Sequence, residues 1–211
     1  MRGSSGYGRG FPIETENRKP SLFLFSHQLR LTNLPIALII LILMKNIYIV
    51  GFMGTGKTAV GKLLAKRLGL EFIEMDELIE QRQGRKIVDI FAQDGEGAFR
   101  KLESELLGEL SKRQDLVISC GGGLICEEVN LKLLRTSGTV FCLSASSSTI
   151  YERTKRYSHR PLLNVDKPLE KIEKLLAARE PYYSQAHHLI DSNGLSVDEV
   201  ADKIINILKQ A

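Results

Sequence analysis

Cysteine is scarce in this chain, which has only three among its 211 residues. Cys120, Cys126 and Cys142 are odd in number, lie in or near apolar runs and lack Cys-x-x-Cys spacing. This pattern does not suit a disulfide framework, and we interpret the three as reduced core residues in a reducing, cytoplasmic compartment. A metal or redox role is the alternative.

The chain also lacks an apolar run that could cross a bilayer, which needs roughly 20 residues. The run at residues 36–43 is too short, and no small-residue cleavage site follows it. Residues 1 to about 32 are polar and show no sustained period, so we expect them not to fold with the domain. We therefore expect residues 1–43 to be an N-terminal extension and residues 44–211 to form one domain. The extension is upstream sequence read through before a start at Met44, a targeting or anchor segment, or an extra structural element.

A charge excess of one sign is missing from the predicted domain. The whole chain has 29 basic and 25 acidic residues, of which five and two lie in residues 1–43, leaving 24 and 23 from Met44 onward. A nearly neutral domain argues against nucleic acid or an anionic membrane surface as a partner. The hydrophobic fraction of 43% is ordinary for a soluble domain with a full core.

What the chain does contain is a phosphate-binding loop. The residues Gly-Phe-Met-Gly-Thr-Gly-Lys-Thr at 51–58 fit the pattern G-x-x-x-x-G-K-[ST]. Before the loop, the β-branched and aromatic run at 46–50 predicts a buried parallel strand. After it, apolar residues at helical spacing predict a helix that ends at Gly69. Strand, glycine loop and helix thus follow in the required order, although a glycine-rich turn that merely matches is the alternative.

Each residue type in this loop suits a nucleoside triphosphate. The glycines let backbone N–H groups turn inward around a phosphate, and the helix N-terminus adds its dipole. Lys57 would reach the outer phosphates, and Thr58 would ligate Mg²⁺. The predicted nucleotide contacts are Gly54, Thr55, Gly56, Lys57, Thr58 and Ala59.

Two carboxylates follow in a second β/α unit, at residues 71–76. At a two-residue spacing on a strand, Glu74 and Asp76 would share a face close to the phosphate loop. Acids in that place can bind Mg²⁺ through water or take a proton from an attacking hydroxyl. Alternatively, Asp76 is only the N-cap of the helix that follows.

A later helix, predicted from about residue 97 to 112 after a break at 94–95, carries Arg100 and Glu103 three residues apart. The pair is either an ordinary solvated ion pair or a guanidinium oriented by a carboxylate to bind an anion. The strand at 116–119 runs into Gly121, Gly122 and Gly123, which predicts close approach of backbone to a ligand rather than a flexible turn.

The second half of the chain predicts a strand at 139–143, a helix at about 146–155, a helix at 168–178, a last strand at 187–191 and a final helix after a capping box at 196–199. Between the first two helices, residues 153–163 carry four basic side chains and a proline. Such a segment is either a lid that closes over a triphosphate or a solvated basic loop.

This order of features resembles the shikimate kinase family from about Met44 to Gln210. The motifs that carry the resemblance are GFMGTGKT at 51–58, MDELIE at 75–80, DIFAQDGEGAFRKLE at 89–103, GGG at 121–123, RPLL at 160–163 and REPYY at 179–183. The resemblance implies a three-layer α/β/α phosphate-loop kinase, with a five-stranded parallel sheet like that of the nucleoside-monophosphate kinases and a mobile lid. It also implies a monomer that uses ATP and Mg²⁺ to convert shikimate to shikimate 3-phosphate, a step toward aromatic amino acids.

The resemblance also assigns residues. Asp76 would bind the substrate hydroxyls and act as base, and Arg100 and Arg179 would clamp the substrate carboxylate. The glycines Gly122 and Gly123 would approach the ring. On the nucleotide side, the assigned residues are Lys57 and Thr58, with Arg160 on the phosphates and Arg153 against the adenine.

Two departures from the family pattern stand out. Relatives commonly carry aspartate where this chain has Glu74, a position associated with water-mediated Mg²⁺ binding, so the metal geometry is expected to shift slightly. The segment at 193–195 lacks the basic residue that some relatives use against adenine. A gluconate or nucleotide kinase and a non-catalytic nucleotide-binding switch are the rival interpretations.

Overall fold

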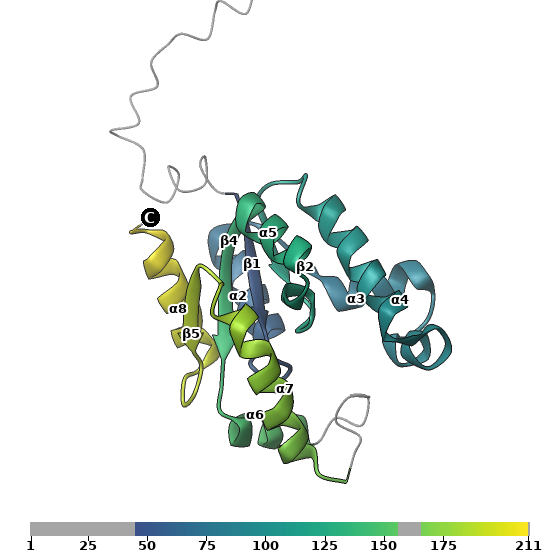
Figure 1. Cartoon of the computed structure of the whole chain (residues 1–211). Coiled ribbons are helices and arrows are strands. Elements are labelled where there is room, and N and C mark those ends of the chain that lie inside the picture. The colour runs from purple at the N-terminus through teal and green to yellow at the C-terminus, as the bar shows by residue number, and fades with distance from the viewer. Residues whose placement is uncertain (1–44, 156–165, 211) are drawn as a thin grey trace, which may run out of the picture. The chain divides into compact units, whose positions relative to one another are not determined.

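Five parallel strands form the sheet on which the site is built (Figure 1). The computed structural model describes residues 45–155 and 166–210. The predicted extension at 1–43 and the lid residue Arg160 lie outside these ranges. The strand order is β2-β3-β1-β4-β5, which confirms the predicted sheet. The strands are β1 (Asn46–Gly51), β2 (Glu71–Glu74), β3 (Leu116–Ser119), β4 (Gly138–Ser144) and β5 (His188–Asp191).

Helices connect consecutive strands and carry the chain back to the end of the sheet at which each strand begins, as parallel pairing requires. They are α2 (Lys57–Leu68), α3 (Met75–Gln83), α4 (Ile87–Leu110), α5 (Glu128–Ser137), α6 (Ser147–Thr154), α7 (Pro168–Tyr183) and α8 (Val197–Leu208), with a short 3₁₀ turn η2 (Leu124–Cys126). Among the described helices, none is long and apolar enough to cross a membrane.

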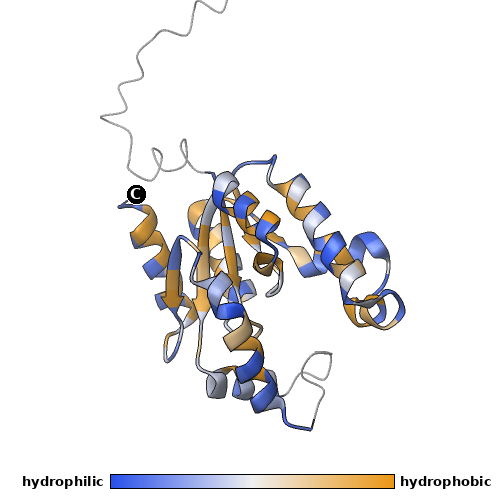
Figure 2. Ribbon diagram, in the orientation of Figure 1, coloured by the Kyte–Doolittle hydropathy of each residue, from blue (hydrophilic) through white to orange (hydrophobic). Residues whose placement is uncertain are grey.

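Alternate side chains of each central strand enter two separate cores, one on each face of the sheet. In β1, Ile47 and Ile49 pack with α2 and α8, whereas Tyr48 and Val50 pack with α4, α5 and α7. Figure 2 shows the strands as the most hydrophobic part of the domain. Strands buried on both faces read as continuous apolar runs, which is why the sequence predicted them well. The three-layer α/β/α architecture is confirmed.

Two local predictions need correction, and one helix was not predicted. Asp76 is not at the end of a strand, because β2 ends at Glu74 and Asp76 lies in the first turn of α3; nor is it the N-cap, which is Glu74. The helix predicted to end near Ala178 continues to Tyr183 through Pro181, since burial of Arg179 and Tyr183 anchors its last turns. The helix α5 was not predicted at all.

The break predicted at residues 94–95 is present within α4. Gly95 has φ 84° and ψ 170°, so α4 consists of two helical segments that meet at a kink. Arg85 closes the turn between α3 and α4 onto this kink, where it pairs with Asp94 and donates a 3.0 Å hydrogen bond to Gln93. In Figure 1, α3 and α4 lie together at one side of the sheet and α8 lies at the other.

Candidate active site

A pocket of about 810 Å³ opens where β1, β2 and β3 end. The segments that follow these strands supply its walls, together with α4 and α7. In open parallel sheets, ligand sites lie at the C-terminal ends of the strands, because the loops that follow the strands converge there. Its lining includes Lys57, Asp76, Arg100, Gly122, Gly123 and Arg179.

The phosphate loop is held in its turn by its own backbone and by α6. Gly51, Gly54 and Gly56 have φ of 132°, 80° and 99°, a region that side chains rarely adopt. A Cβ on Gly54 would also lie 2.9 Å from Thr154 Cγ2. Arg153 of α6 donates a 3.2 Å hydrogen bond to the carbonyl of Gly54. The predicted nucleotide residue Arg153 therefore lies at this loop.

The loop also positions the polar groups that follow it. Lys57 Nζ donates to the carbonyl oxygen of Phe52 at 3.1 Å and lines the pocket. Thr58 Oγ1 donates to Glu74 Oε2 at 2.6 Å, which joins the start of α2 to the end of β2. Burial raises the pKa of Glu74, an effect that this hydrogen bond partly opposes. Thr55, by contrast, serves the loop itself, since its hydroxyl donates to the same Phe52 carbonyl at 2.7 Å.

A buried carboxylate, that of Glu103 on α4, is part of the pocket lining. Its side chain is 0% exposed, and its Oε1 has no hydrogen-bond partner among the described residues. Burial raises its pKa from 4.5 to about 7, against the opposing effect of Arg100. A Cβ on Gly121 would clash with Glu103 Oε1 and lie 3.3 Å from Asp76 Oδ1. The first glycine of the triplet is therefore required by packing against these acids.

The other two glycines face the arginines. A Cβ on Gly123 would come within 2.6 Å of Arg100 Cζ, and one on Gly122 within 3.4 Å of Arg179 Nη1. Tyr183 Oη donates to the Gly122 carbonyl at 2.8 Å and fixes that peptide. Because the triplet carries no side chains, both guanidiniums can pack directly against its backbone at the pocket surface.

The two arginines differ in their partners. Arg100 donates to Glu96 at 2.8 Å and pairs with Glu103 on the same helix. Arg179 is only 9% exposed and lies over the ring of Phe52, with 5.3 Å between its Cζ and the ring centroid. In the described part of the chain, no carboxylate is within ion-pair distance of Arg179. The charge of Arg179 opposes the burial-driven rise in the pKa of nearby Glu103 without forming an ion pair with it, and a buried cation that lacks a directly paired carboxylate favours an anionic ligand.

The structure thus brings together most of the predicted site. Lys57, Asp76, Arg100 and Arg179 line one pocket, with Gly122 and Gly123 between them. Thr58 and Glu74 form a pair beside it, and Ala59 is exposed on α2, without a described contact to the pocket.

Sequence reasoning missed three residues that shape the site. Glu96 could have been found from its spacing, four residues before Arg100 on one helix. Tyr183 and Phe52 carried no such pattern, because their contacts with Gly122 and Arg179 depend on how α7 packs against the phosphate loop.

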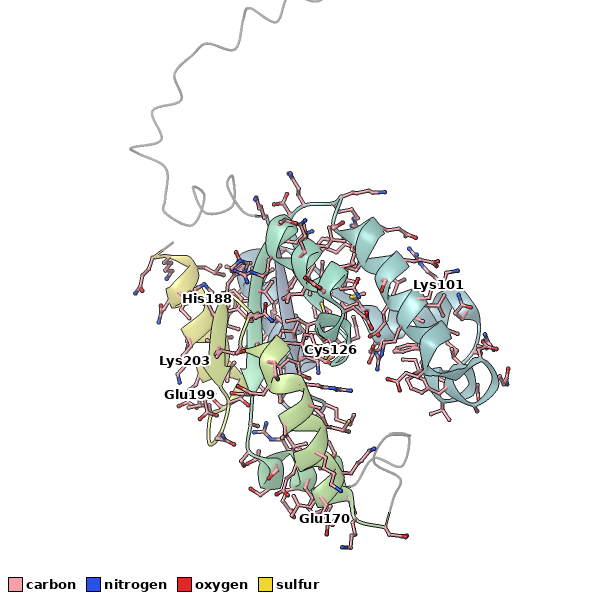
Figure 3. The ribbon with its side chains drawn as sticks, in the orientation of Figure 1. Lys101, Cys126, Glu170, His188, Glu199 and Lys203 are labelled. Atoms are coloured by element: carbon pink, nitrogen blue, oxygen red, sulfur yellow. The ribbon has the colours of Figure 1, made fainter. Side chains whose placement is uncertain are left out.

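The cysteines lie outside the pocket lining. Cys120 and Cys142 are buried and Cys126 is partly buried, and all three are free thiols. Cys126 lies in η2 beside α5 and α7 (Figure 3). Burial raises the pKa of each thiol. A raised pKa means an unreactive thiol, in agreement with the interpretation of core cysteines.

Fold and site together define a phosphate-loop kinase of the nucleoside-monophosphate-kinase-like architecture, with a pocket next to the loop that two arginines help to line. The family model for shikimate kinase matches residues 53–209. A shikimate kinase of Thermodesulfovibrio yellowstonii is 48% identical over 162 residues, which are 77% of this chain and 94% of that protein. One from Pelotomaculum thermopropionicum is 43% identical over 167 residues, 79% and 97% of the two chains.

Solved structures agree. The shikimate kinase of Acinetobacter baumannii in complex with shikimate superposes with a TM-score of 0.77 at 40% identity, covering 80% of this chain and 94% of that one. A gluconokinase of Sinorhizobium meliloti reaches 0.52 at 18% identity, covering 79% and 92%, a likeness of fold alone. This chain belongs to the shikimate kinase family.

Proposed function

We propose that this protein transfers the γ-phosphoryl group of ATP to the 3-hydroxyl of shikimate, giving shikimate 3-phosphate and ADP. One observation carries the proposal. A single pocket holds the phosphate-loop lysine and a carboxylate together with two guanidiniums, one of them buried. This set fits an acceptor with a hydroxyl to phosphorylate and a carboxylate to anchor. The Acinetobacter baumannii relative was solved with such an acceptor bound.

The arginines would anchor the acceptor. A guanidinium presents N–H groups in a planar fork that matches a carboxylate, and burial strengthens the attraction. Arg179 has no acidic partner among the described residues, so it would supply the stronger attraction. Arg100 would supply the second fork. The backbone of Gly122 and Gly123 lies against both side chains and would let the ring come close.

Asp76 and Lys57 would act at the reacting end. Asp76 would orient the 3-hydroxyl and accept its proton as the oxygen attacks the γ-phosphorus in line. The new O–P bond forms while the bond from the γ-phosphorus to the β,γ-bridging oxygen breaks, and ADP leaves with that electron pair. Lys57 would stabilise the negative charge that gathers on the transferred group. Little covalent chemistry is asked of the protein beyond this positioning.

Thr58 and Glu74 would hold Mg²⁺, the glutamate through water. Their oxygens are 2.6 Å apart beside the phosphate loop, and hydroxyl and carboxylate oxygens are the ligands that this cation prefers. No cluster of three metal-ligating side chains occurs within the described ranges, which suits a cation held largely by phosphates and water. When bound, Mg²⁺ supplies a positive charge that neutralises the phosphate oxygens.

The remaining assignments complete the nucleotide site. Arg153 would lie against the adenine, and its hydrogen bond to Gly54 already places it beside the loop. Arg160, outside the described residues, would contact the phosphates. We further propose that the protein is a monomer and that it works in a reducing, cytoplasmic compartment. The three free thiols support the reducing compartment.

A coupled ADP-release assay on the full chain tests the proposal. Mg-ATP is supplied with shikimate, gluconate, a nucleoside monophosphate or no acceptor in parallel reactions. We expect ADP release that depends on shikimate and exceeds the rate with every other acceptor. Faster release with gluconate or a nucleotide would reject shikimate as the acceptor. Equal release without any acceptor would reject acceptor phosphorylation altogether.

A further inference from the structure

Arg100 already lies between two carboxylates of its own helix. Its Nη2 donates to Glu96 Oε1 at 2.8 Å, and its Nη1 donates to Glu103 Oε2. The guanidinium is mostly buried, with 18% of the side chain exposed. Two of its five N–H donors are thus engaged, so a substrate carboxylate that forms a forked pair with both terminal nitrogens competes with these partners.

Glu103 is the fixed partner. Its side chain is 0% exposed, and Gly121 closes the space around its Oε1. If the pair with Arg100 were broken, an uncompensated carboxyl group would be left in the core, which is costly. Glu103 therefore stays with Arg100 whether or not a substrate is bound.

Glu96 is the exchangeable partner. Its side chain is 54% exposed, so a released carboxylate is rehydrated at little cost. It also begins the second helical segment of α4, directly after the non-helical Gly95. The dipole at a helix N-terminus favours a carboxylate there even without Arg100. Both features lower the cost of moving Glu96 off the guanidinium.

We propose that Glu96 is an internal competitor for Arg100, holding the guanidinium in the free protein and giving way to the carboxylate of the acceptor. This inference rests on the proposed function, since it takes the acceptor to be a carboxylic acid. Glu96 then tunes both affinity and selectivity. An acceptor with a carboxylate offsets the lost ion pair by forming a new one, whereas a neutral polyol has nothing with which to displace it.

Calorimetric titration of shikimate into the full chain without nucleotide tests the inference. The substitution Glu96→Gln keeps the length and the carbonyl oxygen of the side chain but removes its charge. Because exposed ion pairs contribute up to about 1 kcal/mol, we expect the Kd for shikimate to fall roughly two- to fivefold. The KM for ATP should stay unchanged.

Two control variants separate competition from a general change in charge. Glu105→Gln removes the carboxylate that pairs with Lys101. This pair lies on the same helix with the same four-residue spacing, and the Glu105 side chain is 58% exposed. Lys101 projects from the outer side of α4 in Figure 3. Glu109→Gln removes another exposed carboxylate of α4, which pairs with Arg82 and does not line the pocket. Both should leave the Kd within experimental error.

The outcomes are distinct. An unchanged or higher Kd for Glu96→Gln would overturn the competition, and so would an equal gain in affinity in Glu105→Gln or Glu109→Gln. In both cases the unmodified protein would still bind shikimate, and the proposed function would stand. A failure of the unmodified protein to bind shikimate would instead remove the proposed function and this inference with it.

Discussion

At the scale of single residues, the proposed function assigns Arg179 to binding of the acceptor and Lys57 to the chemical step. Arg179 is buried against Phe52 and faces the pocket, whereas Lys57 projects from the start of α2 beside the phosphate loop. Substituting each should therefore change a different kinetic constant.

We expect Arg179→Gln to raise the KM for shikimate roughly 10- to 100-fold with a much smaller change in kcat. A hydrogen-bonded charge pair is worth about 1.5–3 kcal/mol, and it is present in the ground state as well as the transition state. Arg67→Gln is the control, because Arg67 pairs with Asp198 and Asp202 on the surface between α2 and α8. Steady-state kinetics would refute the assignment if KM stayed constant.

Lys57→Ala should lower kcat by at least about 100-fold at saturating shikimate. Removing one preorganised donor to developing charge has an effect of this size. Shikimate binding measured by calorimetry should persist, because the arginines are untouched. A variant with near-normal kcat would show that the phosphate loop does not perform the chemistry.

The buried carboxyl group of Glu103 should make the free energy of unfolding depend on pH. Its pKa rises from 4.5 to about 7 on burial, so the folded protein binds more protons than the unfolded chain between these values. The free energy of unfolding therefore falls as pH rises through this window. We expect the wild-type stability, relative to Glu103→Gln, to be highest below pH 4.5 and to decline up to about pH 7. Urea unfolding from pH 4 to 8 measures this, and a constant difference would contradict it.

At the scale of elements, the glycine triplet after β3 and the helix α4 depend on each other. The carboxylate of Glu103 and the guanidinium of Arg100 occupy the space that side chains at Gly121 and Gly123 would need. A Cβ at Gly121 would therefore displace the buried carboxylate of Glu103, and one at Gly123 would displace the guanidinium that α4 brings to the pocket.

Two glycine substitutions test this dependence. Gly121→Ala should destabilise the fold by about 1–3 kcal/mol, as overpacking of a close-packed site does. Gly108→Ala, within α4 and with nothing within 4 Å of the added Cβ, should instead stabilise it by about 0.5–1 kcal/mol. Thermal unfolding of the two variants should move in opposite directions. A shared direction would show that contact with Glu103 does not dictate the glycine.

At the scale of the whole molecule, the sequence predicted the sheet because its three central strands, β1, β3 and β4, are largely buried and read as apolar runs. The glycine loop and its strand and helix were equally clear, since each depends on local pattern alone. The helix α5 was missed because it follows η2 without a strong stop or cap, and its N-cap Glu127 makes no side-chain cap hydrogen bond. The helix predicted at 168–178 continues through Pro181, because Arg179 and Tyr183 are buried and hold its last turns in place.

The sequence indicated which residue types form the site, but not which of these residues contact one another. Spacing indicated that Arg100 and Glu103 are neighbours, and the same argument could have found Glu96, yet only packing shows that Glu103 is fully buried. Asp76 was expected either at the end of a strand or as the N-cap of the next helix, and it lies instead in the first turn of α3. The roles of these residues remain predictions that the substitutions above are designed to test.

Identification of the product tests the central claim most directly. The full chain is incubated with Mg-ATP and shikimate, and the product is examined by mass spectrometry and by proton and phosphorus NMR. We predict a single phosphate ester on the 3-hydroxyl, formed in equal amount with ADP. An ester at another position, phosphate released to water, or no phosphorylated acceptor would contradict the arrangement of Asp76, Lys57 and the two arginines argued above.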